Sequence, residues 1–549
     1  MSTDHDCIIV GAGASGTIVA ALLAEAGKRV LLVERGTLED YRSAGHRDHL
    51  RNQRFSPHGH NVGPDILGNP RVLVDEAGTE HVLAPHQYGY HNNAAVVGGG
   101  TFVYGGMAWR FLPDDFRMAS RYGVPAGSSL VDWPISYQDL APFYDRAEWK
   151  IGVSGDGRGP VQSGPRSRDY PMPPAARGPA AATLRSGADA LGINTFSPPL
   201  LINTVPRDGR DRCIQCGSCV GFPCPSNGKN GTQNTMLPRA LATGACELVT
   251  RAMVESVDTD ASGKVTGISY LREDEHGAIT RHSATARMVV VSAAAIETAR
   301  LLLASKSVMH PEGLGNTNGQ VGLNLQGHYY PTAFGLFEDD VYDERGPGVT
   351  IGTCDFNHGN DGIIGGAMLA DDFIMLPVIF WNTALHPGLQ RWGKPAKDFM
   401  RENYRRVIQV KGPVQEIPSP ECRVSLDPVV RDKFGLPVAR LSGIAHEETV
   451  RTASFMLRKG KEWLSASGAK EVWGTEPARR LSGGQHQAGT CRMGTDPEYS
   501  VTDLYGRVWG HDNLFVCDGS LNPTNGGFNP VLTIMAMAFR NAEHMLGAL

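Results

Sequence analysis

The stretch DCIIVGAGASGTIVAALLAEAGKRVLLVERG, residues 6–36, decides the fold of this chain. A short apolar run is followed by three closely spaced glycines, then by residues of helical composition, and then by a second apolar run that ends in an acid. Short apolar runs bounded by glycine are typical of buried strands, and their alternation with a helix is typical of a parallel sheet. The stretch predicts a strand, a turn, a helix and a second strand over residues 7–10, 11–16, 17–26 and 30–33.

The glycines of the turn, Gly11, Gly13 and Gly16, have the spacing G-x-G-x-x-G. Without side chains there, the backbone can approach a pyrophosphate at the N-terminus of the helix, and an acid about 20 residues further on can accept hydrogen bonds from a ribose. Glu34 has the place of that acid. The sequence therefore predicts an α/β fold with a Rossmann-like domain that binds an adenine dinucleotide. Further candidate contacts in the same stretch are Ala14, Ser15 and Arg35.

The composition is that of an ordinary soluble globular protein, with 41% apolar and 20% charged residues. A length of 549 residues exceeds one hydrophobic core, so two or more domains are expected. The net charge of −5 provides no basic face for nucleic acid or anionic lipid. Neither a basic signal peptide nor an uncharged apolar run of roughly 18 residues is present, which predicts a cytoplasmic protein without a membrane span. The 10 cysteines are therefore expected to be reduced thiols.

Two later segments fit the same sheet. ARMVVVSAAAIETARLLLAS, residues 286–305, predicts a strand, a turn of small residues and a helix. CELVTRAMVESVDTD, residues 246–260, predicts a strand that brings Val254 against the adenine. A place in the ordinary hydrophobic core explains Val254 equally well, and the sequence leaves both interpretations open.

The most specific motifs lie near the C-terminus: HQAGTCRMG (486–494), NLFVCDGS (513–520) and GGFNPVLTIMAMAFR (526–540). With them the chain resembles the glucose–methanol–choline (GMC) oxidoreductases, flavoenzymes that oxidise alcohols. The resemblance is to the bacterial sugar- and glycoside-oxidising members, of the pyranose oxidase, glycoside 3-oxidase or dehydrogenase and gluconate dehydrogenase type, and it is weakest over 335–480. It also rests on VVGGGTFVYGGMAWR (96–110), DWPISYQDLAPFYDRAE (132–148) and QVGLNLQGH (320–328).

The resemblance implies that His486 and Asn529 face the flavin and share the substrate hydroxyl. Hydride transfer from a carbinol carbon requires its hydroxyl proton to leave, and a neutral imidazole is a suitable base near pH 7. An asparagine amide can hold the same oxygen without competing for the proton. The alternatives are that His486 caps a turn and that Asn529 starts the following helix, because Asn-Pro is a favourable pair at that position.

The resemblance also implies FAD rather than NAD as the cofactor. Asp518 and Gly519 of the turn CDGS resemble a contact of the family with FAD, and Asn529 and Pro530 are expected to touch the isoalloxazine, with the dipole of the helix that follows aimed at it. Some sugar-oxidising relatives attach FAD covalently through a histidine of the segment equivalent to 96–110. No histidine stands at 101–104, so non-covalent FAD is expected. Candidate contacts in that segment are Gly99, Gly100, Thr101, Gly106 and Met107.

RCIQCGSCVGFPCP, residues 212–225, is close to the run C-x2-C-x2-C-x3-C-P that holds iron–sulfur clusters in bacterial ferredoxins, but its last gap is one residue longer. Some family members that pass electrons to cytochromes carry a cluster in this region with different spacing, and others share this pattern without needing one. An iron–sulfur cluster, a zinc site of four thiolates and metal-free thiols or a local disulfide all remain open. We expect a metal-free structural loop near the flavin. The cysteines concerned are Cys213, Cys216, Cys219 and Cys224.

The domains are expected to be discontinuous. Alternating apolar residues around a D-x-F-G turn at 420–443 predict antiparallel strands, and EETVRTASFMLRKGKEWLSASG, residues 447–468, predicts an amphipathic helix. These belong to a substrate-binding domain over 335–480, built on an antiparallel sheet. The FAD-binding domain is expected to combine 1–50, 85–130, 210–330 and 480–549, with 131–209 as a connecting excursion.

The motifs together predict oxidation of an alcohol by hydride transfer to flavin N5, at a secondary hydroxyl of a sugar or glycoside that becomes a keto sugar. An amino sugar oxidised at a primary hydroxyl, a sterol and an aliphatic alcohol are the alternatives within the family. A non-catalytic flavin-binding or electron-transfer subunit is the alternative from another class, against which the intact His486 and Asn529 argue. The electron acceptor (oxygen, a quinone or another carrier) stays open, because oxygen access depends on the shape of the cavity.

Overall fold

The computed structural model describes residues 3–41, 62–91, 94–157, 164–371 and 377–549. Its parallel sheet is built around β1 (His5–Val10), which pairs with β2 (Val30–Val33) and with the second half of β8 (Ile279–Val291). Because both faces of this sheet are covered, β1 and β2 have continuous apolar sequences rather than alternating ones. The outer strands are β5 (Cys246–Val249) beside β2 and β16 (Leu514–Val516) beside β8.

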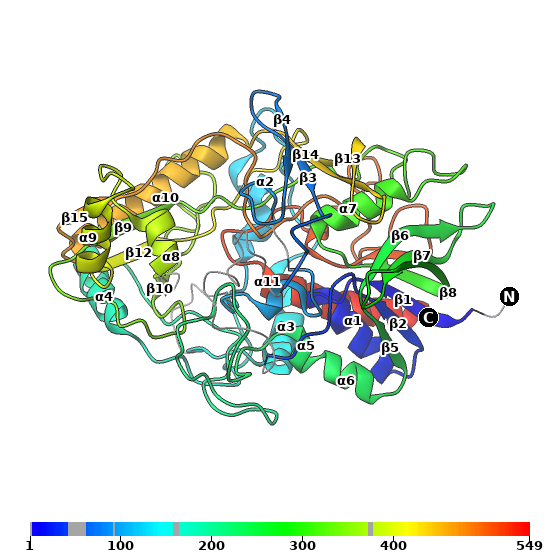
Figure 1. Ribbon diagram of the computed structural model, residues 1–549, viewed down its shortest axis with the longest axis horizontal. Coiled ribbons are helices and arrows are strands. Elements are labelled where there is room, and N and C mark those ends of the chain that lie inside the picture. The colour runs from blue at the N-terminus through cyan, green and yellow to red at the C-terminus, as the bar shows by residue number, and fades with distance from the viewer. Residues whose placement is uncertain (1–2, 42–61, 92–93, 158–163, 372–376) are drawn as a thin grey trace.

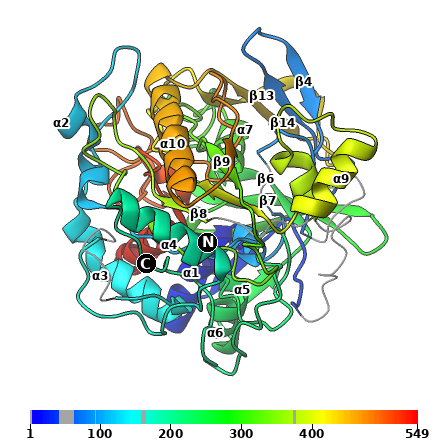
Figure 2. The ribbon, with the colours of Figure 1, turned by 90° about the vertical axis from the view of Figure 1, so that its left-hand side faces the viewer.

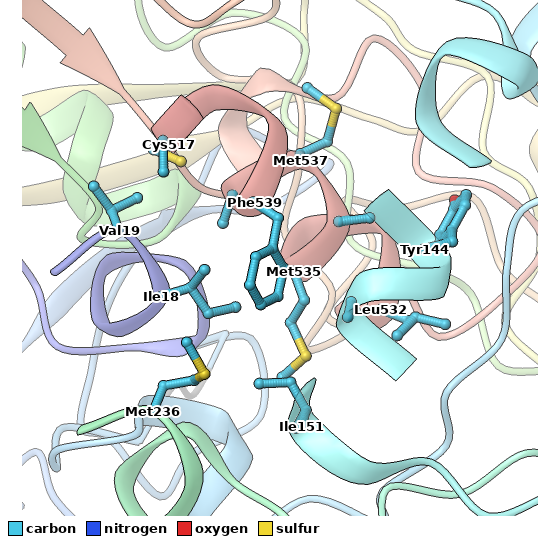
Figure 3. Close-up of a cluster of buried hydrophobic side chains, with 14 of the residues drawn as sticks. Ile18, Val19, Tyr144, Ile151, Met236, Cys517, Leu532, Met535, Met537 and Phe539 are labelled. Atoms are coloured by element: carbon cyan, nitrogen blue, oxygen red, sulfur yellow. The ribbon is translucent and has the colours of Figure 1, made fainter. Parts of the chain in front are cut away.

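Two helices from opposite ends of the chain pack side by side on this sheet (Figure 1). The helix α1 (Ala14–Glu25) is apolar on all sides, and such a helix is expected to be buried on all sides. In Figure 3 its Ile18 points toward Met535 and Phe539 of α11 (Val531–Ala548). The glycine turn at the start of α1 is thereby attached to the C-terminal motifs.

The first half of β8 leaves the parallel sheet and forms an antiparallel layer. It pairs with β7 (Val265–Glu273), which pairs with β6 (Ala252–Thr259). After β8 a short turn leads into α7 (Ala295–Ala304), so the predicted strand, turn and helix over 286–305 are present.

A second sheet is antiparallel and lies on the left of Figure 1. The predicted amphipathic helix is α10 (Glu447–Ala466), which packs against this sheet and against α4 (Pro179–Leu191) (Figure 2). The predicted fold class, a Rossmann-like domain joined to a part built on an antiparallel sheet, is confirmed. The sheet order is β10 (Gly352–Thr353), β11 (Leu369–Ala370), β12 (Val407–Lys411), β9 (Thr332–Leu336) and β15 (Glu471–Trp473).

The predicted hairpin at 420–443 forms the strands β13 (Arg423–Arg431) and β14 (Pro437–Ser442) of a third sheet. There β14 pairs in parallel with β3 (Arg71–Val74), whose other neighbour is β4 (Glu80–Leu83). Among the described residues, no strand pairing joins this hairpin to the second sheet. Residues 1–2, 42–50, 92–93, 158–163 and 372–376 of the predicted domain segments lie outside the described residues.

None of the helices within the described ranges is long and apolar enough to cross a bilayer. The other helices are short. They are α2 (Met118–Tyr122), α3 (Tyr137–Ala147), α5 (Thr232–Thr235), α6 (Leu237–Ala242), α8 (Pro377–Ile379) and α9 (Lys394–Asn403), with 3₁₀ turns at Gly99–Phe102, Pro113–Arg117 and Gly519–Leu521 and π-helical turns at Glu148–Gly152 and Phe380–Ala384.

Candidate active site

A cavity of about 960 Å³ is lined by residues of the parallel sheet, the antiparallel layer and the second sheet. It receives the ends of β1 and β2, which is where ligands bind in open parallel sheets. Every predicted site residue except Gly16 and the four cysteines lines it. Those lining it are Gly11, Gly13, Ala14, Ser15, Glu34, Arg35, Gly99, Gly100, Thr101, Gly106, Met107, Val254, His486, Asp518, Gly519, Asn529 and Pro530.

The glycines of the N-terminal turn are required for different reasons. Gly11 has φ +102°, and a Cβ atom there would lie 2.3 Å from the carbonyl oxygen of Ser292. A Cβ atom on Gly16 would lie 2.0 Å from the carbonyl oxygen of Gly11, so Gly16 serves the packing of α1 rather than the cavity wall. A Cβ atom on Gly13 would meet no protein atom within 4 Å, which leaves room for a ligand beside the turn.

Glu34 lies buried at the end of β2, with both carboxylate oxygens held in place. The backbone N–H groups of Ala12 and Gly36 donate to Oε2 and Oε1 at 2.9 and 2.8 Å. Burial raises the pKa of the Glu34 carboxyl, while these two donors act against the rise. Each oxygen keeps a second lone pair for another donor, so the carboxylate fits the predicted contact with a ribose.

A buried ion cluster lies next to Glu34. Arg71 and Arg300 donate to the carboxylate of Glu297 at 2.6 and 2.7 Å, and Arg35 lies 3.7 Å from it. Burial raises the pKa of Glu297, but the three guanidinium groups overcome this and hold it far below its usual range. Arg300 and Glu297 line the cavity, and neither is a candidate by sequence because the charges meet only in the folded chain.

Asp518 lines the cavity and connects, through hydrogen bonds, its own turn at 518–520 with the turn at 292–295. Its carboxylate accepts hydrogen bonds from the Ala294 N–H at 3.0 Å and the Thr298 hydroxyl at 2.6 Å, and from both the N–H and the hydroxyl of Ser520. Burial raises the pKa of this carboxyl. The turn that it fixes, residues 292–295 at the start of α7, also lines the cavity, although only its small-residue composition marks it in the sequence.

His486 and Asn529 meet at one wall of the cavity. The Tyr330 hydroxyl lies 2.9 Å from His486 Nδ1 and 3.5 Å from Asn529 Nδ2. On its other side, His486 Nδ1 lies 2.9 Å from Nδ1 of the buried His328, whose Nε2 is 2.8 Å from the carbonyl oxygen of Gly526. Neither Tyr330 nor His328 is a candidate by sequence, because 158 residues separate His328 from the histidine it contacts.

The cysteine loop forms another part of the wall through residues 220–222. Its four cysteines are free thiols, and within the described ranges no three His, Cys, Asp or Glu side chains converge as a metal site. Burial raises the pKa of Cys219 to about 12, whereas Cys216 is exposed. The N–H of Gly221 donates to the carbonyl oxygen of Val103 at 2.7 Å, which attaches the loop to the glycine-rich segment 96–110.

Lys229 strengthens this attachment from inside the protein. Its buried ammonium donates to the carbonyl oxygens of Tyr104, Cys219 and Phe222 at 3.1, 2.8 and 2.8 Å. The three protons of the ammonium therefore join the two segments that line this side of the cavity.

Comparisons with known proteins place the chain in one family. The family described as GMC oxidoreductase matches twice, with its N-terminal profile over residues 5–330 and its C-terminal profile over 418–538. The 2-methyl-1,2-propanediol dehydrogenase of Mycolicibacterium austroafricanum is 33% identical over 98% of this chain and 95% of its own length. The paromamine 6'-oxidase of Streptomyces fradiae is 30% identical over 99% and 92%, and the fructose dehydrogenase large subunit of Gluconobacter japonicus is 26% identical over 99% and 98%.

Solved structures support the same fold. The pyridoxine 4-oxidase from Mesorbium loti has a TM-score of 0.66 at 17% identity, and the alignment covers 99% of each chain. A formate oxidase from Aspergillus oryzae has a TM-score of 0.64 at 14% identity, covering 100% of this chain and 99% of the other. The profile matches and the extent of the identity show that the chain belongs to the GMC oxidoreductases, FAD-dependent enzymes that oxidise alcohols.

Proposed function

We propose that the protein oxidises a secondary hydroxyl of a sugar or glycoside to the keto sugar, with His486 as the base and Asn529 as the group that holds the alcohol oxygen. The observation that carries this proposal is the meeting of the two side chains at one cavity wall, within 2.9 and 3.5 Å of a single hydroxyl, that of Tyr330. A substrate hydroxyl in the adjoining space meets a nitrogen base and an amide together. Bound FAD supplies the hydride acceptor, so the task of these side chains is to orient the alcohol and to remove its proton.

Asn529 supports a ligand at this wall in a second way. Its carbonyl oxygen Oδ1 is buried and has no hydrogen-bond partner among the described residues. A buried acceptor without a donor costs about 1–3 kcal/mol, so natural proteins rarely retain one. A ligand with an N–H or O–H group in the cavity would satisfy this oxygen.

The residues proposed to hold FAD all line the cavity. Gly11 and Gly13 would let the backbone approach the pyrophosphate, Glu34 would bind the adenosine ribose, and Val254 would pack on the adenine. The N-terminus of α11 behind Pro530 would direct its positive end toward the isoalloxazine. With no histidine at 101–104, the attachment is proposed to be non-covalent.

The polar lining beyond this pair supports a sugar rather than a sterol. Neutral amides and hydroxyls are distributed along the part formed by residues 328–411 and 475–487, which suits a substrate with several hydroxyl groups. Among the described charges of this part, Lys411, Arg391 and Arg480 outnumber Glu476, which is less suited to a cationic aminoglycoside. The neutral groups are Tyr329, Tyr330, Thr332, Asn382, Thr383, Gln409, Thr475, Ser482, Gln485 and Gln487.

A short aliphatic diol is the second candidate substrate, because the Mycolicibacterium relative named as a diol dehydrogenase is 33% identical over nearly the whole chain. Flavin reduction decides between the two. The purified protein should be mixed without air with a neutral hexose, a methyl glycoside, paromamine and 2-methyl-1,2-propanediol, and the visible flavin bands followed. Bleaching that is much faster with the hexose or the glycoside than with the other compounds supports the proposal. Bleaching by the diol alone replaces it with the second candidate.

The roles of the two side chains have a separate test. His486→Ala should retain FAD and lower the rate of flavin reduction roughly a hundredfold or more, the usual scale for a lost general base. Asn529→Ala should lose less, because an amide orients the alcohol without removing its proton. Substrate deuterated at the reacting carbon should react more slowly in the wild type. Near wild-type reduction by His486→Ala with full flavin content would contradict the assignment of the base.

We propose that the protein is cytoplasmic and passes its electrons to oxygen, a quinone or another carrier. Oxygen uptake, compared with the reduction of a soluble quinone by the same reduced protein, decides between oxidase and dehydrogenase activity. Fractionation of the native cells locates the protein.

A further inference from the structure

The surroundings of His328 determine where its hydrogen lies. Its Nε2 is 2.8 Å from the carbonyl oxygen of Gly526, and a carbonyl oxygen only accepts, so Nε2 carries the hydrogen. Burial lowers the pKa of His328 to about 4, which keeps the ring neutral near pH 7. A neutral imidazole with its hydrogen on Nε2 has a lone pair on Nδ1. His328 therefore presents an acceptor to its neighbour.

That neighbour is His486, whose Nδ1 lies 2.9 Å from Nδ1 of His328, with the two rings nearly perpendicular at 88°. At this distance one of the two nitrogens must donate to the other. Since His328 Nδ1 has the lone pair, the hydrogen is on His486 Nδ1. The lone pair of neutral His486 is then on Nε2, which lies 3.5 Å from the Tyr330 hydroxyl and is the nitrogen that can take a proton from the substrate.

The Tyr330 hydroxyl is the competing partner of the same nitrogen, at 2.9 Å. If Tyr330 donated to a lone pair on His486 Nδ1, that lone pair would also face the lone pair of His328 at 2.9 Å, which is repulsive. Instead, the Nδ1–H of His486 donates to two acceptors, Nδ1 of His328 and the Tyr330 oxygen. The Tyr330 oxygen also accepts from Asn529 Nδ2 at 3.5 Å.

The backbone of His328 is held in an unfavourable conformation to make this contact. Its φ is +116°, a region that side chains other than glycine rarely adopt. The buried carboxylate of Glu416 accepts from the N–H groups of Gly327 and His328 at 3.0 and 2.8 Å, and the Ser482 hydroxyl donates to it at 3.1 Å. Residues with a strained backbone conformation that hydrogen bonds keep in place occur mostly at functional sites.

We propose that His328 is a positioning residue of the oxidation: it holds His486 in the tautomer whose Nε2 accepts the hydroxyl proton. This rests on the proposed role of His486 as the base. When the O–H bond of the alcohol breaks and the proton joins Nε2, His486 becomes an imidazolium that still donates its Nδ1–H to His328. His328 therefore stabilises both the starting tautomer and the charged product of the proton transfer.

The neutral partner has a consequence for the base. A carboxylate in this place would favour the charged form of His486 before the substrate arrives, whereas an imidazole fixes the tautomer without adding a negative charge. Among the described residues, titratable or charged groups near the pair include the Tyr330 hydroxyl, the Lys411 ammonium 5.8 Å from the Tyr330 ring, and Glu416 on the main-chain side of His328.

The tautomer can be measured without any substrate. The holoenzyme labelled with 15N-histidine should show, at neutral pH, one ring that is protonated on Nδ1 and not on Nε2 and whose signals disappear in His486→Gln. The signals lost in His328→Asn should belong to a ring protonated on Nε2. Assignment of His486 as the Nε2–H tautomer in the resting holoenzyme would overturn the proposal, whatever the activity.

Two substitutions of His328 then separate positioning from structure. His328→Asn keeps an acceptor, because the amide oxygen of asparagine occupies nearly the place of Nδ1, and asparagine tolerates positive φ better than most residues. His328→Leu removes the acceptor. With FAD content equal, flavin reduction by the Leu variant should be roughly tenfold or more slower than wild type, and the Asn variant should recover most of that loss.

The pH profile completes the test. The acid limb of flavin reduction should move to lower pH in His328→Leu, because the imidazolium of His486 has lost its acceptor, and should return toward wild type in His328→Asn. Equal rates and equal pH profiles in the two variants would overturn the positioning role. If no alcohol reduces the wild-type flavin, the proposed function fails instead, and the tautomer measurement still decides the place of the hydrogen.

Discussion

Alanine substitutions at two glycines of the N-terminal turn should have different effects, one on the stability of the fold and the other on cofactor binding. Gly16→Ala places a methyl group 2.0 Å from the carbonyl oxygen of Gly11, inside the protein. Gly13→Ala places it where no protein atom lies within 4 Å, beside the cavity. We therefore expect Gly16→Ala to destabilise the fold itself, and Gly13→Ala to leave the fold intact while obstructing the cofactor.

The magnitudes follow from these contacts. Ordinary contacts of a Cβ atom begin at 3.4 Å, so α1 or the Gly11 carbonyl must move by more than 1 Å to accommodate the methyl group on residue 16. Overpacking of this kind costs about 1–3 kcal/mol in the free energy of unfolding. At residue 13 the φ of −79° is open to alanine, and the loss of a glycine N-cap is offset in part by the less flexible unfolded chain, which leaves a change of about 0.5 kcal/mol or less. The same methyl group should weaken FAD binding tenfold or more, about 1.4 kcal/mol.

Urea unfolding with and without a large excess of FAD separates the two effects. FAD raises the stability of any variant that binds it, by an amount that grows with the ratio of its concentration to the dissociation constant. Gly16→Ala should have a lower midpoint in both conditions, whereas Gly13→Ala should match wild type without FAD and gain less from it. An unchanged midpoint for Gly16→Ala, or full FAD affinity in Gly13→Ala, would refute this account of the turn.

Three further predictions concern other parts of the protein. The free energy of unfolding should fall as the pH drops from about 6.5 toward 4, because burial lowers the pKa of His328 from 6.5 to about 4 and that of His91 to about 3, so that the unfolded chain binds more protons in this window. At about 1.4 kcal/mol per pKa unit, His328 accounts for about 3 kcal/mol, which acid titration of His328→Asn by circular dichroism should show as a shallower slope. Lys229→Met leaves three carbonyl oxygens, one buried and two part-buried, without this donor and should lower both the unfolding midpoint and the FAD content, with Lys229→Arg unable to restore all three contacts. Acid or heat should release the flavin into solution. Protein purified without air should contain no stoichiometric iron; about three iron atoms per chain in a metal analysis would instead assign a cluster to the loop 212–225.

Local sequence was sufficient for the N-terminal unit. The strand, turn, helix and strand of residues 5–33 depend on apolar runs and glycines within that stretch, and the structure has them within a few residues of the predicted limits. The hairpin and the amphipathic helix between 420 and 468 were predictable for the same reason. Sequence did not indicate that this hairpin pairs with β3, because partners in a sheet depend on contacts across several hundred residues.

The sequence alone determined the family, the fold class and a part of the cavity lining, since these are carried by ordered motifs whose spacing is set by local backbone geometry. Only the tertiary structure decided what those residues touch. His328 and Tyr330 contact His486 from 158 and 156 residues away, and Lys229 attaches the cysteine loop to Tyr104 across 125 residues. The tautomer of the base depends on the first of these contacts. A hydrogen on one nitrogen of an imidazole is selected by the partner in space, and no pattern along the chain records that partner.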